Sequence, residues 1–187
     1  ETDLILDESF VDFSEKSVEN TLLKNEVLET YPHLTVIKSI SKSYGVPGLR
    51  LGIAASSDKE IISYLRKNMA IWNINSFAEF YLQIYSKYNN DYQNACKKFI
   101  AERQRFFEVL QQVDFLRVIP SQANYFLCEV TSRFSSTKLV SLLLEHNLLL
   151  KDCSTKTGFD GRNYIRIAIR DTEDNNYLAE NLKKLQA

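Results

Sequence analysis

One stretch of the chain, residues 39–52, holds most of the side chains that could do chemistry together. It reads Ser-Ile-Ser-Lys-Ser-Tyr-Gly-Val-Pro-Gly-Leu-Arg-Leu-Gly and lies between two apolar runs. Serine hydroxyls and the arginine guanidinium can bind one phosphate group, because the planar guanidinium pairs with two phosphate oxygens at once. A lysine beside a phosphate anchor can form an imine with a carbonyl cofactor. These residue types favour a pyridoxal phosphate site, although the composition alone also fits an ordinary solvated loop.

The order of the residues in this stretch is more specific than its composition. The pattern Ser-x-Ser-Lys-x-x-Gly-x-x-Gly-x-Arg-x-Gly resembles the lysine signature of the class I/II aminotransferases, which are pyridoxal-phosphate enzymes of fold type I. The resemblance implies that Lys42 forms the Schiff base with pyridoxal 5'-phosphate. It also implies that Ser39, Ser41 and Arg50 bind the cofactor phosphate.

Asp7 stands at the end of the short apolar run Leu4-Ile5-Leu6, which predicts a buried parallel strand. Ligands bind at the carboxyl ends of such strands, although a turn or a helix cap explains a lone aspartate equally well. The family resemblance assigns Asp7 to the pyridine nitrogen of the cofactor, as a binding and a catalytic residue. Phe10 departs from the family pattern, because many members carry a tyrosine there whose hydroxyl bonds the cofactor.

Hydrophobic periodicity and helix-capping residues predict helices and strands along the whole chain. The first half is expected to contain a helix over 17–31, strands at 34–37 and 51–55, and two helices that begin with capping boxes at Ser57 and Ser76. The second half is expected to contain a long helix over 91–113, strands at 116–119, 125–130, 148–151 and 163–169, a helix over 137–146 and a final helix capped by Thr172.

Two residues of the second half are candidates for substrate binding. The stretch Pro-Ser-Gln-Ala-Asn-Tyr at 120–125 resembles a family element that contains an asparagine, here Asn124. Arg166 lies in the strand-like segment Tyr-Ile-Arg-Ile-Ala-Ile-Arg, where it is either an outward-facing edge residue or a ligand for substrate. The resemblance implies that its guanidinium binds the substrate α-carboxylate.

The predicted elements indicate an α/β protein. The resemblance implies the carboxyl-terminal part of a fold type I large domain over residues 1–90, followed by a linking helix and a small α+β carboxyl-terminal domain over 91–187. Because the resemblance covers only the carboxyl-terminal half of a family member, we expect the chain to be part of a longer enzyme. Members of this family are usually homodimers, and we expect the same of the full-length protein.

Composition and charge argue against several other classes of protein. The 23 basic and 24 acidic residues nearly cancel, so no broad basic surface for nucleic acid is expected. No apolar run reaches the roughly 18 residues that span a membrane. The two histidines have no partners at metal-ligand spacing, so no metal site is expected. Three widely spaced cysteines favour a reduced, cytoplasmic setting.

The expected function is that of an aminotransferase acting between an amino acid and a keto acid. Two branches of the family look nearest, histidinol-phosphate aminotransferase and threonine-phosphate decarboxylase, and segments 7–10, 72–75 and 158–166 resemble the second more. Both branches use amino acids that bear phosphate, so a phosphate- or phosphonate-bearing substrate is expected. Decarboxylation and a non-catalytic scaffold of the same fold remain alternatives. A nucleotide-phosphate loop is disfavoured, because the order Gly-x-x-x-x-Gly-Lys-Ser/Thr is missing.

Overall fold

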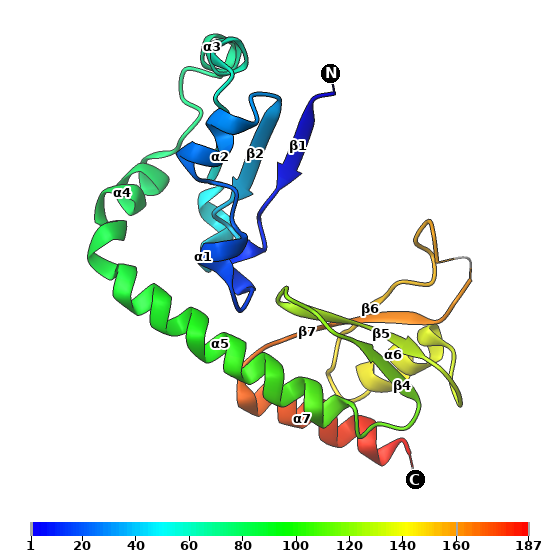
Figure 1. Ribbon diagram of the computed structural model, residues 1–187. Helices are drawn as coiled ribbons and strands as arrows, with labels where there is room; N and C mark the ends of the chain where they lie inside the picture. Colours follow the sequence, from blue (N-terminus) through cyan, green and yellow to red (C-terminus); the bar gives the residue numbers. More distant parts are fainter. Residues whose placement is uncertain (1, 160, 187) are drawn as a thin grey trace. The chain divides into compact units, whose positions relative to one another are not determined.

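The computed structural model describes residues 2–159 and 161–186 (Figure 1). It divides into two compact units, Glu1–Lys97 and Lys98–Ala187, and the division falls inside the long helix α5 (Asn89–Leu110). The expected mixture of helices and strands is confirmed, whereas the assignment of residues 1–90 and 91–187 to two family domains stays a prediction. Among the described residues, none of the helices is both long enough and apolar enough to cross a membrane.

The first unit is built on a three-stranded sheet with the order β1-β2-β3. β1 (Leu4–Asp7) runs parallel to β2 (Leu34–Ser39), and β3 (Gly52–Ala55) runs antiparallel to β2, so the predicted strands are confirmed. The parallel register places Asp7 beside Ile37. Both strands therefore deliver their carboxyl ends to the same edge of the sheet.

β1 is not the buried strand that its apolar sequence predicts. Leu4 is 57% exposed and Ile5 is 69% exposed, whereas Val36 in β2 is fully buried. The physical reason is position in the sheet, because β1 lies at its edge and β2 has a neighbouring strand on each side. The apolar run thus predicted that a strand forms here, but not that the strand lies exposed at the edge of the sheet.

The single helix expected over 17–31 is interrupted. α1 (Ser17–Asn20) and α2 (Asn25–Thr30) are separated by four residues. The buried Glu8 carboxylate accepts the hydroxyl of Thr21 and the backbone N–H of Leu22, each at 2.6 Å. Because the N–H of Leu22 bonds a side chain, it does not form a helical backbone hydrogen bond, and the helix ends before this residue.

Three helices begin with a cap one residue away from the predicted one. Their caps are Asp58 for α3 (Lys59–Asn68), Asn75 for α4 (Ser76–Ile84) and Asp171 for α7 (Thr172–Lys184), instead of Ser57, Ser76 and Thr172. In each case a side-chain oxygen accepts backbone N–H groups of the first turn. The hydroxyl of Ser57 donates instead to the carbonyl of Leu28 at 2.6 Å, so it is not available as a cap.

The second unit has a four-stranded antiparallel sheet in the order β4-β5-β7-β6. The strands are β4 (Leu116–Ile119), β5 (Tyr125–Val130), β6 (Lys151–Asp152) and β7 (Tyr164–Ala168). Buried side chains of the sheet, of α5, of α6 (Ser136–Leu144) and of α7 meet in one hydrophobic core, which includes Phe106, Phe126, Leu139, Ile165 and Leu182.

The strand expected at 148–151 is the one strand prediction that needs correction in this unit. β6 begins only at Lys151. The backbone N–H of Leu148 donates to the carbonyl of Leu143, and Asn147 has a left-handed backbone with φ 60°. These features close the end of α6, so the chain leaves the helix too late to form a longer strand.

Polar contacts join α5 to α7, which lie side by side in this unit (Figure 1). Glu102 of α5 accepts hydrogen bonds from Thr172 Oγ1 at 2.9 Å and Asn175 Nδ2 at 2.7 Å, at the start of α7. Arg105 pairs with the same carboxylate at 2.7 Å. These hydrogen bonds, that of Arg105 foremost, lower the pKa of Glu102 to about 2.

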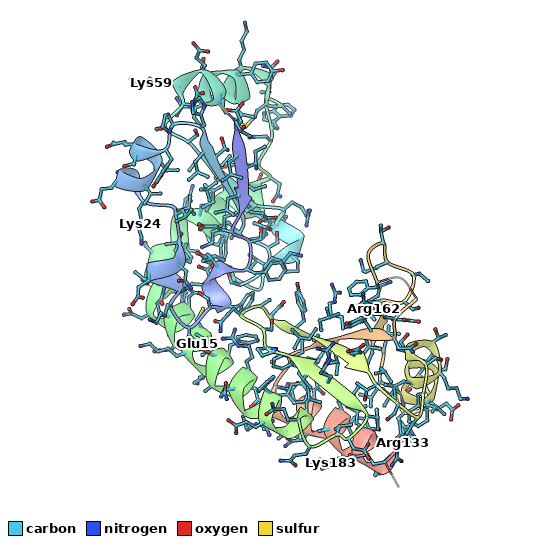
Figure 2. The ribbon with its side chains drawn as sticks, turned by 45° about the vertical axis from the view of Figure 1, so that its right-hand side comes forward. Glu15, Lys24, Lys59, Arg133, Arg162 and Lys183 are labelled. Carbon is cyan, nitrogen blue, oxygen red and sulfur yellow. The ribbon has the colours of Figure 1, made fainter. Side chains whose placement is uncertain are left out.

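The other end of α7 is tied to the turn that follows α5 (Figure 2). Lys183 Nζ donates to Gln112 Oε1 at 2.8 Å. Arg133 donates to the backbone carbonyl of Gln186 and pairs with Asp114 at 3.2 Å. Both ends of α7 are thus fixed by polar groups, while its middle enters the core.

Glu102→Gln is expected to destabilise the second unit by about 1–3 kcal/mol at pH 7, because it weakens charged hydrogen bonds, one of them to the buried Asn175. A carboxyl group with a depressed pKa contributes stability above its ordinary pKa of 4.5 and loses it as the pH falls toward about 2. Urea unfolding at a series of pH values measures the difference. Glu108→Gln, at an exposed position of the same helix, is the control. A difference that stays constant from pH 7 to pH 2 would contradict this role.

Candidate active site

Ser9 links the end of β1 to the end of β2. Its hydroxyl and its backbone N–H both donate to Asp7 Oδ1, at 2.5 and 2.8 Å. The same hydroxyl oxygen accepts the backbone N–H of Ser39 at 2.9 Å. The Ser39 hydroxyl in turn accepts the backbone N–H of Ser41 at 3.2 Å. Ser9 therefore fixes the Asp7 carboxylate, and its bond to Ser39 connects it to the turn that follows β2.

The Asp7 carboxylate is held in its ionised form. The hydrogen bond from the Ser9 hydroxyl is the main reason that the pKa of Asp7 lies below its ordinary value of 3.8. The Ser9 backbone N–H and the charge of Lys42 lower this pKa further, against the opposing effect of partial burial. An exposed, oriented carboxylate is thereby available to a protonated partner.

Four of the predicted site residues line one open pocket of about 510 Å³ in the first unit, and they are Asp7, Ser39, Ser41 and Arg50. Ser9 lines it with them. The remaining lining comes from β2, β3 and α3, and it is mostly apolar. The structure therefore gathers polar groups from segments that are separated by more than thirty residues in the sequence.

Arg50 enters this pocket from a strained backbone. It follows the 3-10 turn η2 (Pro47–Leu49) with φ 55° and ψ 45°, a left-handed conformation that costs about 1 kcal/mol for a residue with a Cβ. Its Nη1 donates to the carbonyl of Pro47 at 3.3 Å. Within residues 2–159 and 161–186 no carboxylate pairs with its guanidinium. A cation without a counter-charge at a pocket suits an anionic ligand.

Lys42 directly follows Ser41, but its side chain is not among those that line this pocket. The residue is exposed, and its ammonium lies 5.8 Å from the centroid of the Phe10 ring. Phe10 thus places an apolar face beside the lysine where a tyrosine would add a hydroxyl. Gly45, with φ 67°, turns the chain back three residues later.

Ser9 is a site residue that the sequence analysis missed. The available signal was the spacing Asp-x-Ser, since an aspartate side chain commonly bonds the backbone N–H two residues on. That spacing predicts a turn, and it gives no hint of the second bond from Ser9 to Ser39, thirty positions away. Only the parallel pairing of β1 and β2 brings these two residues together.

Arg166 lies in the second unit, on β7 between Leu127 of β5 and Lys151 of β6. It is exposed, and its guanidinium lies 5.3 Å from the centroid of the Tyr125 ring. A pocket of about 560 Å³ is lined by Arg166, Lys151 and Arg170, among others. Across the described part of the chain, no carboxylate pairs with Arg166.

Asn124 precedes β5 and is half-buried. Its backbone carbonyl accepts the N–H of Ile169 at 3.0 Å, just beyond the end of β7. The same pairing region therefore holds Asn124 and the strand that carries Arg166. In the described residues, no group of three or more His, Cys, Asp or Glu side chains is arranged to hold a metal ion.

Comparison with known proteins places this arrangement in a family. The sequence pattern of the family "Aminotransferase class I and II" matches residues 2–182. L-serine phosphate decarboxylase of Sulfurospirillum multivorans is 34% identical, over 97% of this chain and 47% of its own length. Threonine-phosphate decarboxylase of Salmonella typhimurium (31%, 97% and 48%) and histidinol-phosphate aminotransferase 2 of Archaeoglobus fulgidus (32%, 97% and 49%) are similar too. The chain spans about half the length of these relatives.

Solved structures share the fold. A decarboxylase from Sulfurospirillum multivorans matches with a TM-score of 0.85 at 33% identity, over 99% of this chain and 53% of that one. The histidinol-phosphate aminotransferase from Clostridium acetobutylicum matches with a TM-score of 0.88 at 29% identity, over 99% and 54%. The chain therefore belongs to the class I and II aminotransferase family, whose members are pyridoxal-phosphate enzymes of fold type I.

Proposed function

We propose that the full-length protein is a pyridoxal-phosphate enzyme that acts on an amino acid bearing a phosphate group. The observation that carries this proposal is the grouping of Asp7, Ser39, Ser41 and Arg50 around one pocket, next to Lys42. Hydroxyls and a guanidinium without a carboxylate partner suit a phosphate, and an ionised carboxylate suits a protonated ring nitrogen. The residues present therefore fit the cofactor of the family.

Each of these residues has a distinct role in the proposal. Pyridoxal phosphate, when bound, supplies a ring that withdraws electrons from the substrate Cα. Lys42 supplies the amine that holds the cofactor covalently, and it moves a proton to or from Cα. Ser39, Ser41 and Arg50 bind the phosphate. Asp7 keeps the ring nitrogen protonated, because its own pKa is held low.

Arg166 and Asn124 are the proposed substrate ligands, with Arg166 binding the α-carboxylate. Its exposed guanidinium supports this choice, since the neighbouring Arg170 is already paired with Asp174 at 2.5 Å. A planar guanidinium binds a carboxylate through two parallel hydrogen bonds and so fixes its orientation. The proposed small-molecule partners are this amino acid and, for an amino transfer, a keto acid. The same proposal includes a homodimer of the full-length protein and a cytoplasmic location.

Decarboxylation is the reaction that we propose first. Two of the three relatives named above are decarboxylases of phosphate-bearing amino acids, and they are 34% and 31% identical to this chain. The expected amino transfer is the second candidate, supported by the histidinol-phosphate aminotransferase at 32% identity. The two reactions break different bonds at Cα, to the carboxylate or to hydrogen, and Lys42, Asp7 and Arg50 serve both.

The products separate these two candidates. Full-length protein with pyridoxal phosphate and O-phosphoserine or O-phosphothreonine is expected to release CO2 without an added keto acid. An amino group that appears on added 2-oxoglutarate, with no CO2, would establish amino transfer instead. No product from either compound would contradict the proposed substrate class.

Lys42→Ala is expected to abolish both turnover and covalent capture of the cofactor, because it removes the amine that lies beside Phe10 in the turn after β2. Borohydride reduction in the presence of pyridoxal phosphate, followed by intact-mass measurement, should give one adduct on the parent protein and none on the variant. Lys59→Ala, which removes an exposed lysine from the start of α3, is the matched control. A full-length parent without an adduct would favour the non-catalytic scaffold.

Ser9→Ala is expected to raise the pKa of Asp7 toward its ordinary value of 3.8, because it removes the hydrogen bond that lowers this pKa most. The carboxylate would then take up a proton at higher pH than in the parent protein. NMR titration of 13C-labelled aspartate carboxyl groups measures the change. Ser56→Ala, which removes a hydroxyl bond to Leu34 elsewhere in the unit, should leave this titration in place. An unchanged Asp7 titration in Ser9→Ala would refute the role of Ser9.

A further inference from the structure

Lys42 is an exposed residue whose neighbours on both sides are held by hydrogen bonds. Before it, the backbone N–H of Ser41 donates to Ser39 Oγ at 3.2 Å. After it, the hydroxyl of Ser43 donates to Asp12 Oδ2 at 2.7 Å. The backbone that carries the lysine is therefore anchored at two points, while the side chain itself reaches solvent.

Asp12 is the second of these anchors, and it binds two groups at once. It lies in the 3-10 turn η1 (Val11–Phe13), and its Oδ1 pairs with Lys38 Nζ at 2.6 Å. The Asp12 side chain is 16% exposed and that of Lys38 is 9% exposed. Because Lys38 belongs to β2, the carboxylate connects the Ser43 turn to the sheet. Buried pairs of this kind fix a geometry more than they add stability.

Tyr44, the next residue, is also held. Its ring stacks on that of Tyr92 with 4.3 Å between centroids and 5° between planes, and Tyr85 contacts it at 5.4 Å. The Lys38 ammonium lies 5.8 Å from the centroid of the Tyr44 ring. Burial raises the pKa of Tyr44, so this phenol stays neutral beside Asp12. The turn after Lys42 is thus packed against side chains of the first unit at two successive residues.

We propose that Asp12 is a positioning residue for Lys42. It does not line the pocket of the proposed cofactor site, and it acts by holding Ser43 and, through it, the backbone of Lys42. The proposal rests on the proposed function, since positioning is useful only if this lysine captures a carbonyl. An amine whose backbone is fixed in advance reacts faster than one that must first find its orientation.

Ser43→Ala is the variant that tests the positioning role of Asp12, because it removes the bond to Asp12 and leaves the buried Asp12–Lys38 pair intact. Ser43→Thr keeps the hydroxyl and should behave like the parent protein. Ser57→Ala is the matched control, since it removes a hydroxyl bond of similar length, 2.6 Å to the carbonyl of Leu28, in the same unit. Asp12→Asn leaves Lys38 buried without its carboxylate and is expected to show a larger effect.

Two measurements are made on the full-length protein. Amide hydrogen exchange over residues 40–46 reports the order of the turn without any cofactor. The rate at which borohydride traps pyridoxal phosphate on Lys42, followed by peptide mass, reports the positioning of the amine. In Ser43→Ala we expect exchange in this segment to rise about fivefold and capture to slow about fivefold, the effect of one hydrogen bond of ordinary strength. Ser43→Thr and Ser57→Ala should show neither change.

The outcomes separate this inference from the proposed function. Exchange and capture that are the same in Ser43→Ala and Ser57→Ala would overturn the role of Asp12. Faster exchange with unchanged capture would overturn it as well, because the anchor would then be structural only. A parent protein that captures no cofactor on Lys42, with the exchange effect present, would overturn the proposed function and with it the catalytic purpose of the anchor.

Discussion

The two hydrogen bonds of the Ser9 hydroxyl are the interaction on which the site of the first unit depends. Parallel strands bring backbone ends to one edge of a sheet, but they do not orient side chains there. The Ser9 hydroxyl donates to the Asp7 carboxylate and accepts the backbone N–H of Ser39. This one hydroxyl therefore orients the Asp7 carboxylate relative to the end of β2. Without this hydroxyl, the exposed Asp7 carboxylate would keep only the hydrogen bond from the Ser9 backbone N–H and would lose its link to Ser39.

Several arginines of this molecule have carboxylate partners, whereas in the described residues three that line pockets, Arg50, Arg66 and Arg166, have none. The arginines that form ion pairs do so in Arg105–Glu102, Arg117–Glu129, Arg133–Asp114 and Arg170–Asp174. Two of the three without a carboxylate partner, Arg50 and Arg166, line the pockets described above. A chain with a formal net charge of −1 has enough carboxylates to neutralise them. Leaving these two guanidinium groups unpaired is consistent with an anionic cofactor and an anionic substrate.

The sequence predicted those features that depend on neighbours along the chain. Apolar runs located β1 to β5, and the order of residues 39–52 located the lysine turn. Two of the features that the sequence did not predict involve partners that are distant in sequence. Glu8 lies more than ten positions before the point after Asn20 where it interrupts the helix. Asp12 accepts a hydrogen bond from Ser43, which lies thirty-one positions later in the sequence. The predictions of the caps of α3, α4 and α7 were wrong for a local reason. Two polar residues stand at the start of each helix, and either type can cap it.

The two units stabilise their functional residues by different means. In the second unit, Arg166 stands on a strand whose buried neighbours, Ile165 and Ile167, belong to a large hydrophobic core. In the first unit, the apolar cluster beside the lysine turn is small and includes Ile40, Leu51 and Ala78. Apolar burial scales with area, so the lysine turn gains less from packing and relies on directional bonds from serines, Asp7 and Asp12. Substitutions of these polar residues should therefore alter the orientation of Lys42 before they unfold the unit.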